Sequence, residues 1–252
     1  MDTVPASREL VAGLVSAAVA AVPHPFMISD YDTVLFANAP ACEIMRARTL
    51  DELVGQPADR FVHADIREAY ALRRPLIVER RQSIRNVPTK FVALDGSAIV
   101  GRSHLISIEF NGRPSVLWVY HGIAKAAYDG GPDIEQAYGA DRCALVFDAL
   151  PQCMLIHDND RILAANAACR WILGAQSPED LVGRPIESIV HPDGRTAGSV
   201  RRSIIAVSNL DRLDGVAVKL IRVDGRELRL QVDARCIDFD GHRACLVTTG
   251  MG

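Results

Sequence analysis

Histidine and aspartate recur together, at one spacing, in two places of the chain. One residue separates His63 from Asp65, and one residue separates His191 from Asp193. Both side chains are ligands of transition metals, so the pattern raises the question of a metal site. Each aspartate, however, stands where a following helix needs an acceptor for its first N–H groups, and a histidine commonly helps to hold such a turn. We therefore expect a structural role and no metal.

No other group of residues has the spacing of a catalytic site. Catalysis would need a nucleophile beside a base, or paired carboxylates in a pocket, and the sequence contains neither pattern. An enzyme on this chain would need His104, His121 or His157 to face a cavity with an acid nearby. We therefore predict that the chain is not an enzyme by itself.

Composition and charge argue against several function classes. The 252 residues carry a net charge of −3, which gives no overall attraction to nucleic acid or to anionic membranes. Five arginines near Pro75 indicate a solvated helix face and not a phosphate site: Arg73, Arg74, Arg80, Arg81 and Arg85. The six cysteines lack a Cys-x-x-Cys spacing, so we expect reduced thiols. The apolar stretch Leu10–Val22 is too short to span a bilayer, and we expect a cytoplasmic protein with no membrane partner.

The elements that carry these residues occur twice. Residues 23–65 align without a gap onto residues 151–193, and 17 of the 43 aligned positions are identical. The offset of 128 residues is longer than the period of a solenoid, which is about 20 to 50 residues. The chain therefore contains two sibling domains, here called copy one (residues 23–123) and copy two (residues 150–252).

Each copy changes its periodicity in the same order. Two short apolar strands joined by a polar turn come first, and short helical turns and a longer helix follow. Three strands end each copy, and the pairs between them are strong hairpin signals: Asp95-Gly96, Asn111-Gly112, Asp224-Gly225 and Asp240-Gly241. This order predicts an α+β fold in which each copy is a five-stranded antiparallel sheet with helices on one face.

A helical segment precedes each copy. Residues 1–22 carry an amphipathic stripe, and residues 124–149 form a linker with a second helix. These helices either cover the open face of their own sheet or join two subunits. The outer face of copy one is more apolar than that of copy two and needs a cover, which the N-terminal helix or a partner's helix would provide. We expect a homodimer that forms through both segments.

The order of these elements resembles the PAS sensory family. The resemblance rests on the strand order, the Asp and Asn turn residues, the Leu-Val-Gly-x-Pro step and the Val-His-x-Asp start of the longer helix, each of which occurs twice. It covers about residues 22–123 and 150–251. The resemblance implies a sensory protein of signal transduction, which acts on a downstream partner or on a fused output domain.

The resemblance also raises specific cofactors, and the residues that would bind each one can be checked in the sequence. Haem-binding members carry a histidine on or just after the longer helix, and residues 65–82 and 193–207 contain none. Haem is therefore disfavoured, although His104 or His121 could bind it from the sheet.

Flavin is the other cofactor that the resemblance raises. Members with a covalent flavin place a cysteine just after the glycine of the step, where this chain has Gln56 and Arg184. Non-covalent FAD remains an alternative, because Trp118 and Trp171 could stack on its ring. The identity of any cofactor is left open.

A difference between the copies points to a ligand cavity in copy one. In copy two, alternation along the long strand after Gly225 gives an inner face of branched or apolar residues: Leu228, Leu230, Val232, Ala234 and Cys236. The equivalent residues of copy one include glycine and serine: Ile99, Gly101, Ser103, Leu105 and Ser107. Removing that much side-chain volume leaves space unless bulk comes from elsewhere.

We therefore predict that copy one binds a small molecule through these five residues and three aromatic neighbours, Phe91, Trp118 and Tyr70. Copy two would then serve dimerisation and signal relay. One alternative is that the aromatic residues fill the space and both copies form a ligand-free scaffold for protein contacts. A redox sensor with non-covalent FAD is a second alternative.

Overall fold

The computed structural model describes residues 7–121, 138–158, 160–195 and 212–249. The chain divides into two compact units, and each unit holds one copy. One unit is Val22–Arg142, and the other joins Met1–Ala21 to Cys143–Gly252. The N-terminal segment therefore belongs with copy two and not with the copy that follows it in the sequence.

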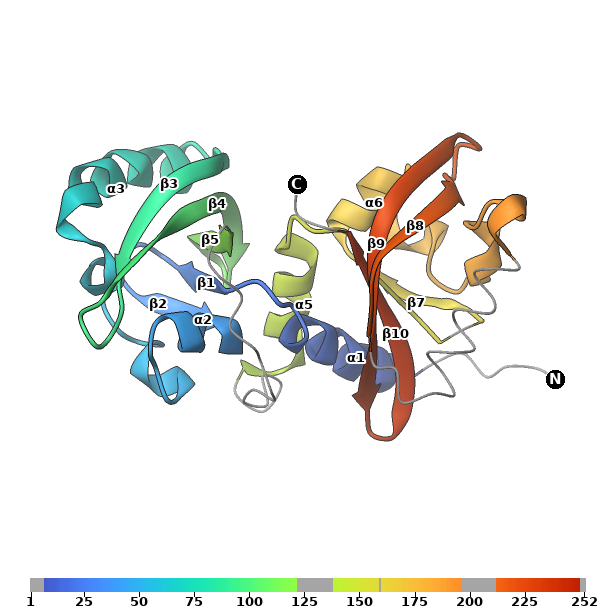
Figure 1. Ribbon diagram of the computed structural model, residues 1–252, viewed down its shortest axis with the longest axis horizontal. Helices are drawn as coiled ribbons and strands as arrows, with labels where there is room; N and C mark the ends of the chain where they lie inside the picture. Colours follow the sequence, from blue (N-terminus) through green and yellow to red (C-terminus); the bar gives the residue numbers. More distant parts are fainter. Residues whose placement is uncertain (1–6, 122–137, 159, 196–211, 250–252) are drawn as a thin grey trace. The chain divides into compact units, whose positions relative to one another are not determined.

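Copy one is an antiparallel sheet of five strands in the order β2-β1-β5-β4-β3, with helical segments on one face (Figure 1). The strands are β1 (Phe26–Ser29), β2 (Val34–Ala37), β3 (Ile84–Val92), β4 (Ala98–Phe110) and β5 (Arg113–His121). The helical segments are α2 (Ala39–Ile44), η1 (Leu50–Glu52), η2 (Ala58–Phe61), η3 (Ala64–Ile66), α3 (Arg67–Arg74) and the π-helical turn η4 (Pro75–Glu79).

Copy two repeats this topology with the strand order β7-β6-β10-β9-β8. The strands are β6 (Met154–His157), β7 (Ile162–Ala165), β8 (Arg212–Ile221), β9 (Glu227–Phe239) and β10 (His242–Thr249). The helical segments are α5 (Ala140–Ala149), α6 (Ala167–Leu173), η5 (Pro178–Asp180), η6 (Ile186–Ser188) and η7 (Pro192–Gly194). From residue 196 on, the longer helix expected in copy two lies outside the described residues.

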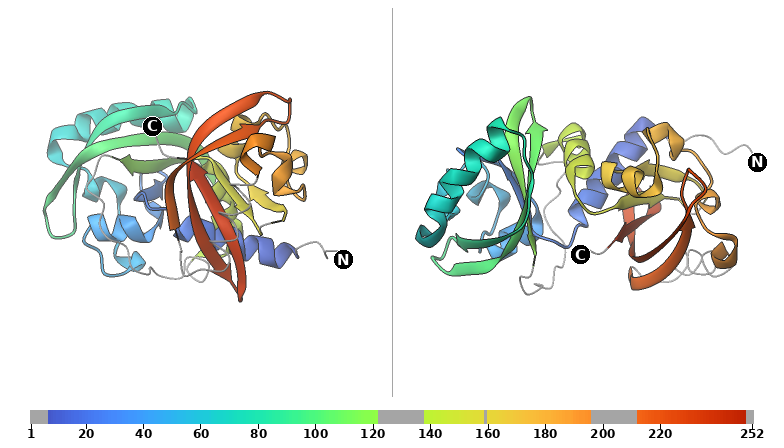
Figure 2. Two further views of the ribbon diagram at one scale, coloured as in Figure 1. Left: turned by 45° about the vertical axis from the view of Figure 1, so that its right-hand side comes forward. Right: turned by 90° about the horizontal axis from the view of Figure 1, so that it is seen from above.

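The predicted fold class is confirmed, and the hairpin turns show why the sequence specifies it. Asn111 and Gly112 have φ angles of 53° and 71°, and Asp240 and Gly241 have φ angles of 52° and 75°. Two consecutive positive φ angles match the right-handed twist of the flanking strands, and Asn, Asp and Gly tolerate them best. The resulting twisted sheets are visible from two further sides in Figure 2.

The N-terminal helix α1 (Arg8–Ala20) packs on the outer face of the sheet of copy two. Gly13 lies against the ring of Phe239 on β9, so close that a Cβ atom on Gly13 would overlap this ring. Arg235 of the same strand donates a hydrogen bond to the backbone oxygen of Ala21, at 2.9 Å. These contacts fix the middle and the C-terminal end of the helix to one strand.

This placement corrects the expectation that the N-terminal helix covers copy one. The outer face of β9 is polar along most of its length but ends in Phe239, which offers an apolar surface. The absence of a side chain at Gly13 lets the helix approach this ring closely. The contact between Gly13 and Phe239 holds the helix against copy two, and the order of the segments in the sequence does not reveal it.

Candidate functional site

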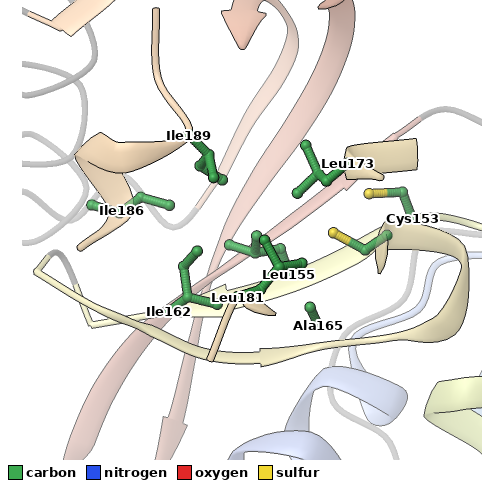
Figure 3. Close-up of a cluster of buried hydrophobic side chains, with 9 residues drawn as sticks. Cys153, Leu155, Ile162, Ala165, Leu173, Leu181, Ile186 and Ile189 are labelled. Atoms are coloured by element: carbon green, nitrogen blue, oxygen red, sulfur yellow. The ribbon is translucent and has the colours of Figure 1, made fainter. Parts of the chain in front are cut away.

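A cavity of about 380 Å³ lies inside copy two. Strands β6, β8, β9 and β10 form one wall, and α6, η6 and η7 contribute to the other. Most of the lining side chains are apolar. Figure 3 shows several of them around the shared interior: Leu155, Leu173, Ile186 and Ile189. The volume falls within the range of about 300 to 1,000 Å³ that is usual for sites of small organic molecules.

Few polar side chains reach this cavity. His157 on β6 is 2% exposed, and Cys245 is its direct partner across the strand pair. Both residues line the cavity. Lys219 and Asp193 also line it, and their charged groups are 3.5 Å apart. A mostly apolar wall with a few fixed polar groups is the usual composition of a ligand site.

Two thiols form a pair on the wall of the same cavity. Cys153 directly precedes β6, and Cys169 lies in the first turn of α6. They are 8% and 1% exposed, respectively. The neighbouring Cys153 side chain, together with burial, raises the pKa of the Cys169 thiol well above its ordinary value. Cys169 is therefore a neutral thiol near pH 7.

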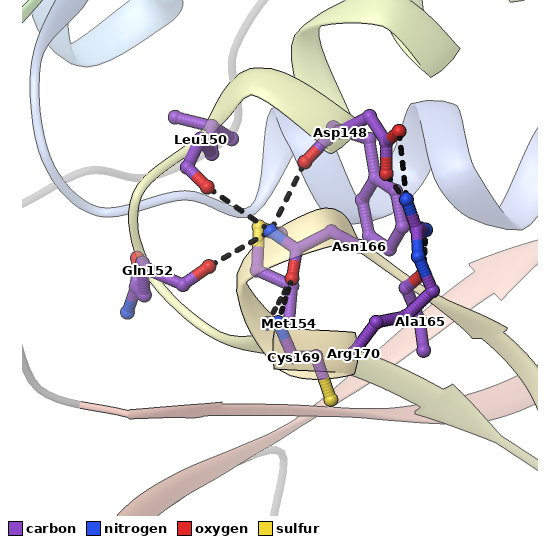
Figure 4. A network of polar contacts seen from close by, with 9 residues as sticks. Asp148, Leu150, Gln152, Met154, Ala165, Asn166, Cys169 and Arg170 are labelled. Atoms are coloured by element: carbon purple, nitrogen blue, oxygen red, sulfur yellow. Dashed lines mark hydrogen bonds and ion pairs between the residues drawn. The ribbon is translucent and has the colours of Figure 1, made fainter. Parts of the chain in front are cut away.

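Asn166 fixes the backbone on both sides of this pair (Figure 4). Its side-chain oxygen accepts hydrogen bonds from the backbone N–H groups of Met154, at 3.0 Å, and of Cys169, at 2.9 Å. Its side-chain nitrogen donates to three backbone oxygens where α5 ends and β6 begins: those of Phe147, Leu150 and Gln152. One buried amide therefore caps α6 and ties it to the start of β6.

Charged side chains gather beside the Lys219 side of the cavity. The Lys219 ammonium lies 3.1 Å from a carboxylate oxygen of Glu227 and 3.1 Å from Nε2 of His191. The hydrogen bond from Lys219 lowers the pKa of the Glu227 carboxyl. Because Glu227 is solvent-exposed, this network adds little to stability, but it places charges of both signs next to the apolar wall.

The His-x-Asp motif is structural in both copies, but the capping residue is the histidine. Nδ1 of His63 accepts a hydrogen bond from the backbone N–H of Asp65, at 3.2 Å, and His191 accepts from Asp193 at the same distance. The expectation that the aspartate caps this turn is wrong, because Asp65 is bonded to Lys90 at 2.6 Å. Among the described residues, no three or more His, Cys, Asp and Glu side chains are placed to hold one metal ion.

Aromatic rings fill the interior of copy one. A pocket of about 20 Å³ lies among these rings, and it is too small for an organic ligand. The ring centre of Trp118 lies 5.5 Å from that of Phe91 and 5.8 Å from that of Tyr70. Tyr120 packs edge-on against Phe91 at 5.0 Å. The open alternative in which aromatic residues fill the interior agrees with this packing.

The residues predicted to bind a ligand in copy one are divided between this pocket and β4. Tyr70, Phe91 and Trp118 meet, but they meet as packed neighbours. The other five predicted ligand residues lie on β4, and none borders the small remaining space: Ile99, Gly101, Ser103, Leu105 and Ser107.

The two serine hydroxyls of this set are bonded within the protein. The Ser103 hydroxyl donates to the hydroxyl of Thr89 at 3.1 Å, and that of Ser107 donates to the backbone oxygen of Ile77 at 2.8 Å. Ile77 belongs to the π-helical turn η4, so this bond ties the turn to the sheet. The serines stabilise the packing of copy one and leave no hydroxyl donor for a ligand.

Models of the PAS domain match both copies. One matches residues 151–250, and another matches residues 14–78. The chain is a tandem PAS protein. PAS domains are sensory modules, so this tandem PAS protein has a sensory role in signal transduction.

Solved structures of single PAS domains resemble parts of this tandem PAS protein. The PAS domain of an HTR-like protein from Haloarcula marismortui is 17% identical, with a TM-score of 0.37 over 45% of this chain and 97% of that chain. The PAS domain of nitrogen regulation protein NR(II) from Vibrio parahaemolyticus is 20% identical, with a TM-score of 0.36 over 43% of this chain and 96% of that one. No curated protein sequence matches significantly. No helix within the described ranges is long and apolar enough to cross a membrane.

The residues considered for flavin or haem do not line the cavity of this tandem PAS protein. Trp171 projects from α6 and is 80% exposed, whereas Trp118 is packed in copy one. His104 and His121 stack on one another, with ring centres 4.6 Å apart, on the outer side of the copy-one sheet. These positions fit neither flavin stacking nor haem ligation inside copy two.

Proposed function

We propose that this tandem PAS protein senses an apolar small molecule bound in the cavity of copy two. One observation carries the proposal: copy two contains a cavity of about 380 Å³, whereas its sibling packs aromatic rings around a pocket of about 20 Å³. The apolar wall suits an apolar molecule, and the imidazole of His157 can orient one polar group of it. The predicted division of labour between the copies is thereby reversed.

Strand β9 offers a route from this cavity to the N-terminal helix. One side of the strand presents Val232 and Ala234 to the cavity, and the other side carries Arg235 and Phe239, which contact α1. A ligand that favours one packing of this sheet shifts the population of helix arrangements, and its differential affinity sets the size of the shift. Copy one, with its filled interior, then acts in relay or as a scaffold.

Val247→Trp tests the cavity directly. This variant gives copy two the residue that copy one has at the equivalent position, Trp118, and it should fill the space between β10 and the helical segments. We expect the wild-type chain to enhance the fluorescence of 1-anilinonaphthalene-8-sulfonate and to carry any co-purified compound into native mass spectrometry. Both signals should disappear in the variant.

Val247→Ala is the matched control, because it enlarges the same cavity and should keep probe binding. Circular dichroism and thermal melting establish that both variants are folded. Equal probe binding by a folded Val247→Trp chain would refute the proposed site.

A ligand-free adaptor is the second candidate function. It is favoured by the filled interior of copy one and by the exposed indole of Trp171, which offers a contact to another protein. This hypothesis predicts no probe binding, no bound compound in the native mass spectrum and a stable dimer in light scattering. Homodimerisation, a downstream partner or fused output domain, a cytoplasmic location and the lack of enzymatic activity stay predictions.

A further inference from the structure

We propose that the paired thiols of Cys153 and Cys169 bind a soft divalent metal ion of linear two-coordinate preference, for which Hg(II) is the test ion. Both side chains belong to one buried cluster, and both line the cavity of copy two. Thiolates are the ligands that soft ions prefer. The cavity gives an ion a path to a pair that is otherwise enclosed.

Backbone hydrogen bonds fix the positions of Cys153 and Cys169 relative to one another. The side-chain oxygen of Asn166 accepts from the N–H of Cys169 and from that of Met154, the residue after Cys153. The carbonyl of Cys153 accepts from the N–H of Thr249 on β10, at 3.2 Å. The pair is therefore positioned before any ion arrives, and binding loses little conformational entropy.

The surroundings favour a divalent ion that needs two ligands. Zn(II) prefers four ligands, and the described residues bring together no group of three or more metal-binding side chains. When a divalent ion binds two thiols, both S–H bonds break, two metal–sulfur bonds form and two protons leave, so the product is neutral. A monovalent ion would leave one negative charge among Leu155, Leu173 and Leu181. Burial of an uncompensated charge is costly, so the neutral product is preferred.

A metal ion does not need a pre-formed thiolate, because it displaces the proton as it binds. Affinity should consequently rise with pH.

Copy one lacks this pair. Its residues at the equivalent positions are Pro25 and Ala41. Copy two also supplies a matched control, because Cys245 lines the same cavity and lies on β10, opposite His157. The proposal deepens the proposed function by naming a ligand class for the same cavity, but it depends on the thiol pair and not on an organic ligand.

The test uses the full chain, reduced and then titrated with Hg(II) in the presence of excess glutathione as a competing thiol. Native mass spectrometry should show one retained ion, and an indicator dye should report two protons released per ion. Cys153→Ala and Cys169→Ala should each lower the affinity by more than about 100-fold, since each removes one of two ligands. Cys245→Ala should retain the ion, and Zn(II) should not compete.

Retention by either pair variant, or loss in Cys245→Ala as severe as in the pair variants, would overturn the assignment. Failure of the wild-type chain to hold Hg(II) against glutathione would overturn it as well. Cys169→Ser, which nearly keeps the side-chain volume, guards against a misfolded alanine variant. Probe binding without Hg(II) retention would refute the metal site but not the organic ligand. Hg(II) retention without probe binding would refute only the proposed organic ligand.

Discussion

The two copies share one topology, but their large interior side chains lie on different strands. On β4, copy one has Gly101 and Ser103 where β9 of copy two has Leu230 and Val232. On the flanking strands the order reverses: Phe91, Trp118 and Tyr120 stand in copy one where Leu220, Val247 and Thr249 stand in copy two. The pairing register supports these equivalences, because Trp118 pairs with Leu105 as Val247 pairs with Ala234.

This comparison shows that a cavity is a property of the whole interior and not of one strand. The small residues of β4 do not border the pocket of copy one, which large rings from β3, β5 and α3 line instead. Large residues on β9 do not close the interior of copy two, because its flanking strands lack rings. Interiors pack to a nearly constant density only where the chain supplies enough volume.

The largest effect expected from this contrast concerns one matched pair of substitutions. Phe91→Ala removes a ring from a filled interior and should destabilise copy one by about 3 to 5 kcal/mol. Leu220→Ala removes a side chain that already borders a cavity, so it should destabilise copy two by only about 2 kcal/mol. Urea unfolding followed by tryptophan fluorescence, in a Trp171→Phe background, isolates the signal of Trp118 for copy one. Circular dichroism follows both copies, and equal losses would contradict the contrast.

A smaller effect is expected from the helix α1, which packs on the outer face of the copy-two sheet. Gly13→Leu drives a side chain into the ring of Phe239 and should destabilise copy two by about 1 to 3 kcal/mol. The melting of copy one should not change. Arg8→Leu, at the exposed start of the same helix, is the control. A loss confined to copy one would mean that α1 covers the other sheet.

The smallest effect is a pH dependence that copy one should have on its outer face. Burial and the neighbouring His121 lower the pKa of His104, and burial and Arg102 lower that of His121. The unfolded chain, with histidine pKa values near 6.5, then binds more protons than the folded chain just below that pH. Stability is therefore complete above about pH 6.5 and falls as the pH drops through the lowered values.

Urea unfolding between pH 5 and 8 measures this slope. His104→Phe keeps a ring against His121 and should flatten the slope for copy one, while its stability at pH 8 stays closer to wild type. Copy two has Asp233 at the position equivalent to His104, so its slope should not respond to the substitution. An unchanged slope for copy one would show that the stacked pair does not control it.

The sequence by itself determined the duplication, the strand order and the turns. Asn-Gly and Asp-Gly pairs tolerate the two positive φ angles of a tight hairpin, and Asn38 and Asn166 cap α2 and α6. These features act between residues that are near in the chain, or that face each other across one strand pair. Local preferences of this kind are readable without coordinates.

Only the tertiary structure decided where the interior is open, where α1 packs and which thiols meet. The cavity depends on residues from four strands and three helical segments at once. Gly13 meets Phe239 across more than 200 residues of sequence. Cys153 and Cys169 pair because Asn166 joins their two elements. Side chains from several distant segments together fill an interior. The pattern along one strand gives only the contribution of that strand.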